Sequence, residues 1–258
     1  MALIKNASQI KKMREVNQLT ASIFTMLDKE VKIGVTTNML DRLVHEYIVD
    51  ELKARPAPLN YKGFPKSICT SLNHVVCHGI PDDTPIKEGD ILNIDVSIEK
   101  DGFYGDTSKM YCVGQVKPFA RRLVDLTQEA LYLAIKKVKP GIPLNMVGKT
   151  IQDFAHRHNL SVVREFCGHG IGTDFHEPPQ VLHYYSPDDS MELKAGMIFT
   201  IEPMINLGAR HIKILADGWT AVTKDRSLSA QWEHTILVTE TGCEVLTLRA
   251  EENLALIR

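Results

Sequence analysis

Apolar residues recur every three or four positions in several stretches of the chain, and this spacing predicts amphipathic helices. The predicted helices span roughly 6–28, 37–54, 118–137 and 144–159. Two apolar, β-rich segments near 90–99 and 103–113 flank Asp101-Gly102, a pair that suits the positive φ angles of a tight hairpin. Asp-Gly at 217–218 and Thr-Gly at 241–242 predict two further hairpins. The sequence therefore predicts an α+β protein.

Two blocks of the chain share one pattern at a constant offset. Residues 29–40 read KEVKIGVTTNML and residues 136–147 read KKVKPGIPLNMV, so six identical residues stand 107 positions apart. Each block lies between two predicted helices. Repetition of this kind indicates a duplicated unit, although short strings can also agree by chance.

The same offset returns in the strand regions. GDILNID at 89–95 matches GMIFTIE at 196–202, again 107 positions apart, which makes Asp95 and Glu202 equivalent. We therefore expect two helix–helix–sheet halves related by an approximate twofold axis. An acidic residue would project from corresponding strands, and a site can form where the halves meet.

Composition supports one folded unit. Apolar residues make up 44% of the 258 residues, which is enough for a sizeable core. No linker or low-complexity stretch divides the chain, so we expect a single domain over 1–258 with halves at about 1–117 and 118–258.

Charge and cysteine content indicate the compartment. The formal net charge is -2, which gives no long-range attraction to nucleic acid or to an anionic membrane. No apolar run approaches the ~18 residues of a membrane span, and the first residues lack the apolar core of a signal peptide. The five cysteines are scattered without a C-x-x-C pair, which favours a reducing compartment. We expect a cytoplasmic protein without a membrane or a specific nucleic acid as partner.

Two aspartates on the predicted 90–113 hairpin are the first candidates for chemistry. Alternation along NIDVSIE places Asp95 on one face with Asn93 and Ser97. Asp106 returns on the adjacent strand, where the two carboxylates can become neighbours. Two bare like charges there are costly unless a cation lies between them. A pair of solvated aspartates at a strand edge is the simpler alternative for these two alone.

Three further residues extend this set. His169 stands between glycines in CGHGIG, Glu202 follows an apolar strand, and Glu233 lies in QWEHT. Each alone is weak, because a buried Glu is often only paired in a salt bridge. Together with Asp95 and Asp106 they form an oxygen-rich set with one imidazole. Such a set suits two divalent ions better than one structural zinc.

Several strings together resemble one known family. They are CHGIPDD (77–83), NIDV (93–96), DGFYGDTSKM (101–110), CGHGIG (167–172), FTIEPM (199–204) and KDRSLSAQWEHT (224–235). Over essentially its whole length the chain resembles the type I methionine aminopeptidases of the short bacterial type, which are pita-bread dinuclear metallopeptidases. The resemblance implies two pseudo-twofold-related halves around a curved antiparallel sheet. It also implies removal of the N-terminal methionine of nascent proteins when the second residue is small.

The resemblance also implies a ligand set for two divalent ions, with Co, Mn, Fe, Zn or Ni as candidates. Asp95 resembles the terminal chelating ligand of one ion, and Asp106 and Glu233 resemble the two bridging carboxylates. His169 and Glu202 resemble the remaining ligands of the other ion. A metal-bound hydroxide would attack the first peptide carbonyl, with Glu202 assisting as general base.

Two histidines match the non-ligand histidines of the family. His176 in FHEP would stabilise the developing oxyanion, and His78 in VCHGIPDD would hydrogen-bond the scissile nitrogen. Without the resemblance a lone histidine is more often a structural residue. The segment 176–179 is not a zincin helix, because its two prolines forbid one.

The substrate side chain would enter an apolar pocket that accepts sulfur. By position, this pocket resembles that of the family and would be lined by Tyr61, Phe64, Cys69, Phe175 and Trp219, although ordinary core residues are the alternative. Phe64 stands where relatives often carry Tyr, and this departure leaves the metal chemistry untouched.

A second cation is also expected by resemblance. Asn73, Val75 and Ser229 resemble contributors to a site for a monovalent cation. The expected partners are deformylated nascent N-termini, with transient association with the ribosome, and we expect a monomer. Neither an N-terminal extension nor a large insertion between His169 and Glu233 is expected, which sets aside two subtypes of the family.

Three other interpretations stay open. A prolidase or aminopeptidase P of the same fold would use the same five ligands and would cleave X-Pro bonds instead. A non-catalytic binding protein on this fold would be expected to lack some ligands, whereas all are present here. A role on the ribosome or RNA alone has no support in the near-neutral composition.

Overall fold

The computed structural model describes residues 4–188 and 190–252. Its helices are α1 (Ala7–Glu30), α2 (Thr37–Glu46), α3 (Pro118–Ile135) and α4 (Asn145–Arg157), with a π-helical turn at Tyr47–Glu51 and a 3₁₀ turn at Tyr61–Gly63. Its strands are β1 (Arg55–Pro56), β2 (Cys69–Leu72), β3 (Val75–Cys77), β4 (Ile91–Lys100), β5 (Phe103–Cys112), β6 (Ser161–Val162), β7 (Gly168–Gly170), β8 (Glu177–Val181), β9 (Ile198–Ile201), β10 (Met204–Asn206), β11 (Ile212–Ile214), β12 (Ala221–Thr223), β13 (Ser229–Gln231), β14 (His234–Val238) and β15 (Cys243–Val245).

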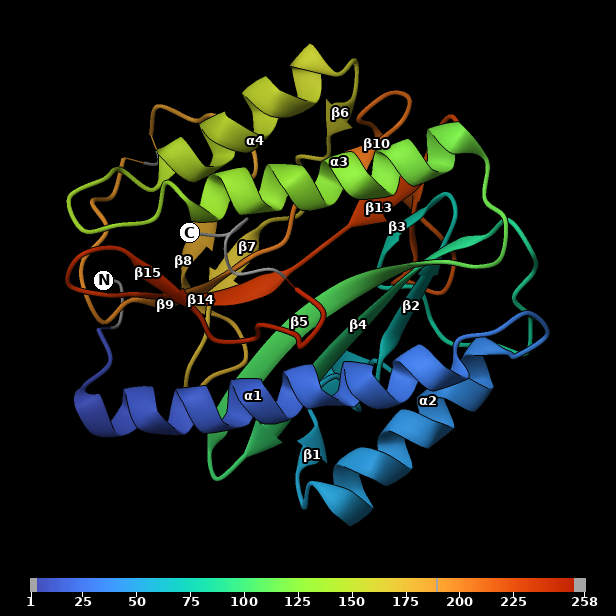
Figure 1. Ribbon diagram of the computed structural model, residues 1–258, viewed down its shortest axis with the longest axis horizontal. Coiled ribbons are helices and arrows are strands. Elements are labelled where there is room, and N and C mark those ends of the chain that lie inside the picture. Colours follow the sequence, from blue (N-terminus) through green and yellow to red (C-terminus); the bar gives the residue numbers. More distant parts are fainter. Residues whose placement is uncertain (1–3, 189, 253–258) are drawn as a thin grey trace.

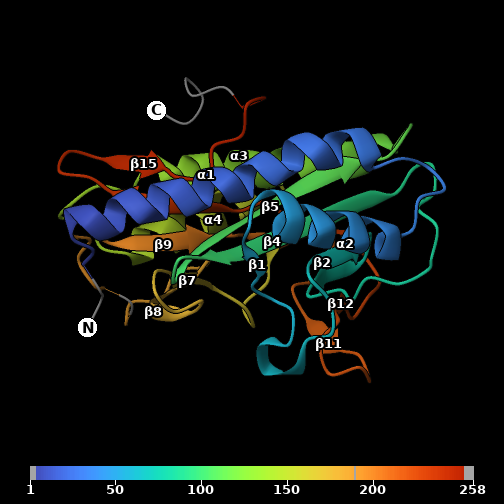
Figure 2. The same cartoon turned by 90° about the horizontal axis from the view of Figure 1, so that it is seen from below.

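The strands form antiparallel sheets, and the helices cover one side of them. One sheet has the order β1-β4-β2, with β5 paired to β4, and another has the order β15-β14-β9-β7-β8. Smaller sheets are formed by β13-β10-β6 and β11-β12-β3. In Figure 1, α1 crosses β4 and β5 with α2 beside it, while α3 and α4 lie over the strands of the second half. Figure 2 shows β8, β11 and β12 on the side away from the helices.

Helix positions follow the predicted periodicity with one difference. The helix α1 begins with a capping box, in which the Asn6 side chain accepts a hydrogen bond from Gln9 N and the Gln9 side chain accepts one from Asn6 N. The second helix was expected to reach 54, but α2 ends at Glu46 and a π-helical turn follows. Lys53 then has a φ of 50°, a left-handed conformation that ends a helix.

Alternation along β4 separates core from site. Ile94, Val96 and Ile98 are fully buried in a cluster with the apolar faces of α1 and α2. Asp95 and Ser97 therefore point to the opposite side of the sheet, as predicted. The helix α1 approaches β5 so closely at Gly105 that an added Cβ would lie 2.4 Å from Thr20 Oγ1.

A second cluster packs α3 and α4 against the strands of the other half. Its fully buried members include Leu123, Ile151, Phe199 and Ile236. Two helix pairs therefore rest on two strand groups, which agrees with a duplicated unit, while the boundary between 117 and 118 stays a prediction. No helix within the described ranges has both the length and the apolar character needed to cross a membrane.

The predicted hairpins are present, and the first fixes the register of the site. Asp101 and Gly102 have φ angles of 52° and 78°, as a tight turn between β4 and β5 requires. The register pairs Asp95 with Ser108 and Ser97 with Asp106. The other two predicted turns join β11 to β12 and β14 to β15.

Candidate active site

A cavity of about 560 Å³ lies on the sheet side opposite the helices. It is lined by every residue predicted for metal binding, catalysis or the side-chain pocket: Tyr61, Phe64, Cys69, His78, Asp95, Asp106, His169, Phe175, His176, Glu202, Trp219 and Glu233. These residues come from both halves of the chain. The structure therefore brings the predicted residues together in one place, while their individual roles stay predictions.

The two aspartates are diagonal neighbours on the β4–β5 hairpin. Asp106 stands opposite Ser97, whose hydroxyl donates to Asp106 Oδ1 at 2.7 Å. Asp95 Oδ1 is buried and accepts no hydrogen bond from the described residues. Burial, together with the charges of Asp106 and Glu202, raises the pKa of Asp95 well above its usual range. A carboxyl group that has one buried oxygen without a partner and two other acids beside it requires either a proton or a cation.

His169 joins the acids from β7. Its Nε2 lies 3.5 Å from Asp106 Oδ2 and 3.7 Å from Glu202 Oε1. Its Nδ1 lies 3.0 Å from the Gly170 carbonyl oxygen, which can only accept, so Nδ1 carries a proton. In the neutral ring Nε2 is then unprotonated and directed at the carboxylates, which is the tautomer that a metal ligand needs.

Glycines flank His169 because neighbouring strands approach closely. A Cβ at Gly168 would lie 2.4 Å from the Thr200 carbonyl oxygen, and one at Gly170 would lie 2.1 Å from that of Pro178. The glycines thus allow β7 to sit between β8 and β9. The close packing of these backbones sets the position of the His169 imidazole beside Asp106 and Glu202.

Glu202 is held by a set of hydrogen bonds directly after β9. Thr200 Oγ1 donates to its Oε1 at 2.8 Å, and Gln231 Nε2 donates to its Oε2 at 3.3 Å. Its main-chain N–H donates to His183 Nε2 at 3.1 Å. Burial raises the pKa of Glu202 to about 7, partly offset by the adjacent His169.

Glu233 completes the acidic cluster between β13 and β14. Burial and the charges of Asp106 and Glu202 raise the pKa of Glu233 well above its usual range. Ligand atoms of Asp106, His169 and Glu233 all lie within 4.8 Å of one another. Carboxylate oxygens with one imidazole suit divalent ions, and the unpartnered Asp95 oxygen needs a counter-charge. The residues present therefore fit divalent metal ions.

Two histidines stand beside this cluster without joining it. The His176 ring centroid lies 4.1 Å from that of His169 and 5.2 Å from that of Tyr61. Burial, followed by the charges of His169 and Lys62, lowers the pKa of His176 to about 3. A neutral His176 can therefore donate a hydrogen bond near neutral pH.

His78 reaches the cavity from a strained backbone. It has a φ of 55°, in the left-handed region that residues other than glycine rarely adopt. Its ring lies 5.1 Å from that of Phe166 and 6.3 Å from that of Trp219. Burial lowers the pKa of His78. Strain held at one residue of a cavity is common at functional sites.

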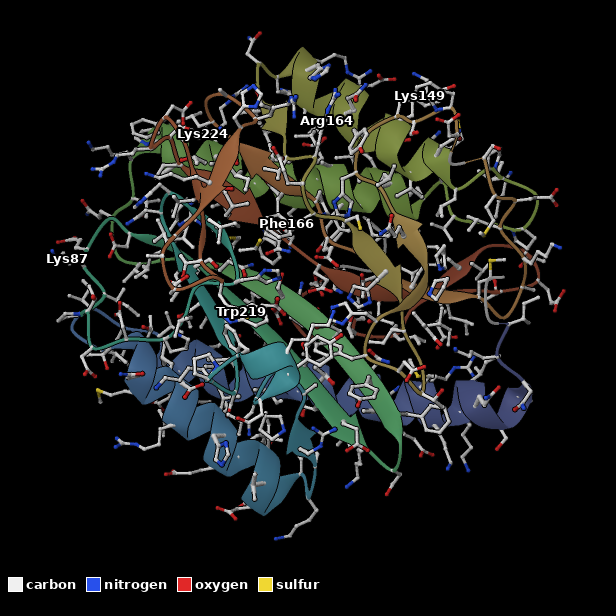
Figure 3. All side chains as sticks on the ribbon, turned by 180° about the vertical axis from the view of Figure 1, so that it is seen from behind. Lys87, Lys149, Arg164, Phe166, Trp219 and Lys224 are labelled. Carbon is white, nitrogen blue, oxygen red and sulfur yellow. The ribbon has the colours of Figure 1, made fainter. Side chains whose placement is uncertain are left out.

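The apolar end of the cavity contains rings and thiols. Phe64 and Trp219 meet edge to face with centroids 5.2 Å apart, and Cys69 is buried nearby. Burial raises the pKa of the Cys69 thiol well above its ordinary value, so this sulfur stays neutral. Figure 3, seen from the side away from the helices, shows Phe166 and Trp219 near the middle of the molecule. The predicted residues therefore lie where an apolar side chain could enter.

Sequence reasoning missed several lining residues. Phe166 and Met204 line the cavity, as do the charged residues Lys62 and Glu165. Phe166 directly precedes CGHGIG, and Met204 ends FTIEPM, so proximity to the motifs could have indicated both. Thr200 and Gln231 also stand within the motifs, but the motifs do not indicate that both side chains donate hydrogen bonds to Glu202.

Comparison with known proteins agrees with the geometry. A model of metallopeptidase family M24 matches residues 11–240. Methionine aminopeptidase from Haemophilus influenzae is 55% identical over 251 residues, covering 96% of this chain and 94% of its own. Methionine aminopeptidase from Escherichia coli K12 is 55% identical over 255 residues, which cover 98% of this chain and 97% of the E. coli protein.

Solved structures give the same result for the fold. The crystal structure of methionine aminopeptidase from Rickettsia prowazekii matches with a TM-score of 0.94 and 51% identity, covering 96% of this chain and 100% of that one. A prolidase from Pyrococcus furiosus matches in fold alone, with a TM-score of 0.74 and 21% identity, covering 97% of this chain and 66% of that one. The predicted α+β pita-bread fold is confirmed. The chain belongs to metallopeptidase family M24.

Proposed function

We propose that this protein is a methionine aminopeptidase that removes the N-terminal methionine from nascent proteins whose second residue is small. The observation that carries this proposal is the convergence of four acids and His169 on one cavity with an apolar end. Two of these acids, Asp106 and Glu233, are buried, and Asp95 and Glu202 are half-buried. The identity of 55% to methionine aminopeptidases over nearly the whole chain supports it.

The five converging residues would hold two divalent ions. Asp95 would be a terminal ligand of one ion, His169 and Glu202 would bind the other, and Asp106 and Glu233 would bridge them. When bound, the ions supply Lewis acidity, which polarises the peptide carbonyl and makes a water acidic near neutral pH. Co, Mn, Fe, Zn and Ni are the candidate metals, because each accepts mixed carboxylate and imidazole ligands.

The protein groups would divide the proton transfers and the charge stabilisation. Glu202 would accept the proton of the attacking water at a carboxylate oxygen, and its hydrogen bonds from Thr200 and Gln231 fix that group in place. Neutral His176 would donate its ring N–H to the developing oxyanion. His78 would hydrogen-bond the scissile nitrogen and assist its departure.

The shape of the cavity would set the specificity. The methionine side chain would lie against Phe64, Cys69 and Trp219, where aromatic rings attract a thioether modestly. The free α-amino group would lie beside Asp95 and Asp106, so a formylated N-terminus would not fit and deformylation must come first. Apolar contact at one end and charge at the other would orient the peptide.

The setting of the enzyme follows from the same proposal. We propose that it works in the cytoplasm as a monomer with transient ribosome association, where deformylated N-termini appear. A monovalent cation would lie near Asn73, Val75 and Ser229. Ser229 Oγ is buried and has no hydrogen-bond partner among the described residues, which supports a ligand there.

Substrate choice tests the proposal. The chelated protein would be reloaded with Mn²⁺, Co²⁺, Fe²⁺, Zn²⁺ or Ni²⁺ singly, with bound metal counted, and given Met-Gly-Met, Met-Ala-Ser and X-Pro peptides. We expect methionine release from the first two, none after chelation, and recovery with at least one metal. Exclusive cleavage of X-Pro peptides would instead identify a prolidase. Formyl-Met-Ala-Ser is the matched control and should stay intact.

A further inference from the structure

The main-chain carbonyl groups of Asp106 and Glu233, the two acids expected to bridge the metals, each accept a hydrogen bond from a threonine near the other acid. Thr235 Oγ1 donates to the Asp106 carbonyl oxygen at 2.7 Å, and Thr107 Oγ1 donates to the Glu233 carbonyl oxygen at 2.6 Å. Thr107 and Thr235 are both fully buried. Each acid is therefore tied by the hydroxyl of a threonine that lies one or two residues after the other acid, and the pair of bonds is reciprocal.

Arg249 orients one of these hydroxyls. Its guanidinium, which can only donate, donates from Nη1 to Thr107 Oγ1 at 3.0 Å and to the Ser108 carbonyl oxygen at 3.2 Å. Because Thr107 Oγ1 accepts from Arg249, its single proton is left to point at the Glu233 carbonyl. Arg249 is only 3% exposed, and its guanidinium lies over the rings of Phe24 and Trp232.

Residues 247–252 fix Arg249 in turn. Glu252 Oε1 accepts from Arg249 Nη2 at 2.8 Å and lies 3.0 Å from His234 Nε2, and it also accepts from the Tyr132 hydroxyl at 2.6 Å. Thr247 Oγ1 accepts from Thr235 N at 3.0 Å. The segment therefore holds both β5 and the start of β14 from the side of the sheet away from the cavity.

We propose that Thr107, Thr235 and Arg249 are positioning residues for the metal centre. They would set the separation of the Asp106 and Glu233 side chains by locking the backbones that carry them. This inference rests on the proposed function, because it assumes that both acids bind the ions. None of the three residues lines the cavity, so their effect would pass through the acids alone.

The physical reason is the cost of holding two buried acids at a fixed distance. When both are ionised, as metal ligands must be, Asp106 and Glu233 repel each other, so the two segments that carry them are driven apart. Two short hydroxyl bonds between the strands oppose that separation where no water can replace them. Partners outside the ligand set commonly change metal affinity or activity by about 10–100-fold when removed.

The test uses substitutions that leave the charge unchanged. Thr107→Val and Thr235→Val each delete one hydroxyl with little change of shape, and Arg249→Lys keeps the charge but loses the forked geometry. Thr127→Val is the matched control, because Thr127 is also fully buried and its hydroxyl donates only to Leu123 O within α3. The full-length, metal-free chains would be titrated with Mn²⁺ by calorimetry, and thermal unfolding would be recorded for each.

We expect Thr107→Val, Thr235→Val and Arg249→Lys each to weaken Mn²⁺ binding by about tenfold. The kcat for Met-Ala-Ser should fall while KM changes by less than about twofold. Thr107→Ser keeps the hydroxyl, so its Mn²⁺ affinity and kcat should stay close to those of the unaltered chain. The Thr127→Val chain should bind Mn²⁺ like the unaltered chain even if it unfolds at a lower temperature.

Two outcomes would separate the inference from the proposed function. If Thr107→Val and Arg249→Lys bind Mn²⁺ as tightly as Thr127→Val, the positioning role is wrong while the enzyme assignment stands. If the unaltered chain itself binds no Mn²⁺ or releases no methionine, the proposed function fails first. If Arg249→Lys does not fold, the two Thr→Val chains decide the question alone.

Discussion

Nε2 of His169 lies 3.5 Å from Oδ2 of Asp106, although the two side chains come from β7 and β5 in different halves of the chain. The Gly170 carbonyl accepts from the other ring nitrogen, Nδ1, so Nε2 is the nitrogen that gains or loses a proton beside the carboxylate. Burial alone would disfavour a charged ring, but the contact with Asp106 and the charge of Glu202 outweigh it and raise the pKa of His169. A divalent ion between these two side chains would take the place of that proton.

Removal of the Asp106 charge should abolish the site. Asp106→Asn keeps the shape but removes a charge shared by two ions, so we expect loss of bound metal and a fall in kcat/KM of more than about 100-fold, beyond the effect of outer partners. The measurement is metal counted per chain together with methionine release. Ser97→Ala, which removes only the hydroxyl on Oδ1, should lose about tenfold or less. Full activity of Asp106→Asn with unchanged metal would contradict the dinuclear arrangement.

The metal-free protein should lose stability as the pH rises. Burial raises the pKa of Glu202 from 4.5 to about 7 and raises those of Asp95 and Glu233 well above their usual ranges. The folded chain then binds more protons than the unfolded chain above about pH 4.5, so the free energy of unfolding falls as the pH rises through 7. The shift at Glu202 alone corresponds to roughly 3 kcal/mol.

Thermal unfolding of chelated and metal-loaded protein at pH 5 and pH 8 measures this effect. Between pH 5 and pH 8, we expect the unfolding midpoint of the chelated protein to fall further than that of the loaded protein. The reason is that bound ions stabilise the ionised acids without protons. An equal change in both samples would show that groups outside the cavity dominate.

His176 should act as a neutral donor. With its pKa lowered to about 3, its ring stays uncharged across the working range, so His176→Ala should lower kcat by about 10²–10³-fold without removing a pH transition between 5 and 9. The pH profile of kcat and the bound metal would be measured together. The control is His156→Ala, an exposed change on α4, which should leave both unaltered. A loss of metal in His176→Ala would make that residue a ligand instead.

Trp219 should contribute to methionine selection. Its ring packs on Phe64 at the apolar end of the cavity, so Trp219→Ala should raise KM for Met-Ala-Ser by about tenfold, while kcat changes less, because burial of the side chain is lost. Phe119→Ala removes an exposed aromatic ring from α3 and serves as the control. Unchanged selectivity between Met-Ala-Ser and Leu-Ala-Ser in the Trp219 variant would place the methionine pocket elsewhere.

Much of the fold could be predicted because its cause is local. The periodicity of apolar residues along 118–137 reports one buried helix face, and the α3 bounds agree with it closely. The prediction was less accurate at 37–54, because the π-helical turn and the left-handed Lys53 depend on packing around that corner.

The acids were predicted as a group, but their mutual geometry was not. Alternation placed Asp95 and Ser97 on one face, whereas the register that sets Asp106 opposite Ser97 depends on the hairpin as folded. Nothing in the spacing of Thr107, Glu233 and Arg249 indicated that they share hydrogen bonds. Such bonds join segments far apart in sequence, and no local pattern reports them.

The sequence by itself determined the helices, the turns, the duplicated pattern and the residue types able to bind divalent ions, because each depends on neighbours along the chain. Only the tertiary structure decided which oxygen of Asp106 faces His169, which groups hold Glu202, and which hydroxyls tie Asp106 to Glu233. The reason is physical: a carboxylate position is set by strand register and by packing between the two halves, to which every part of the chain contributes.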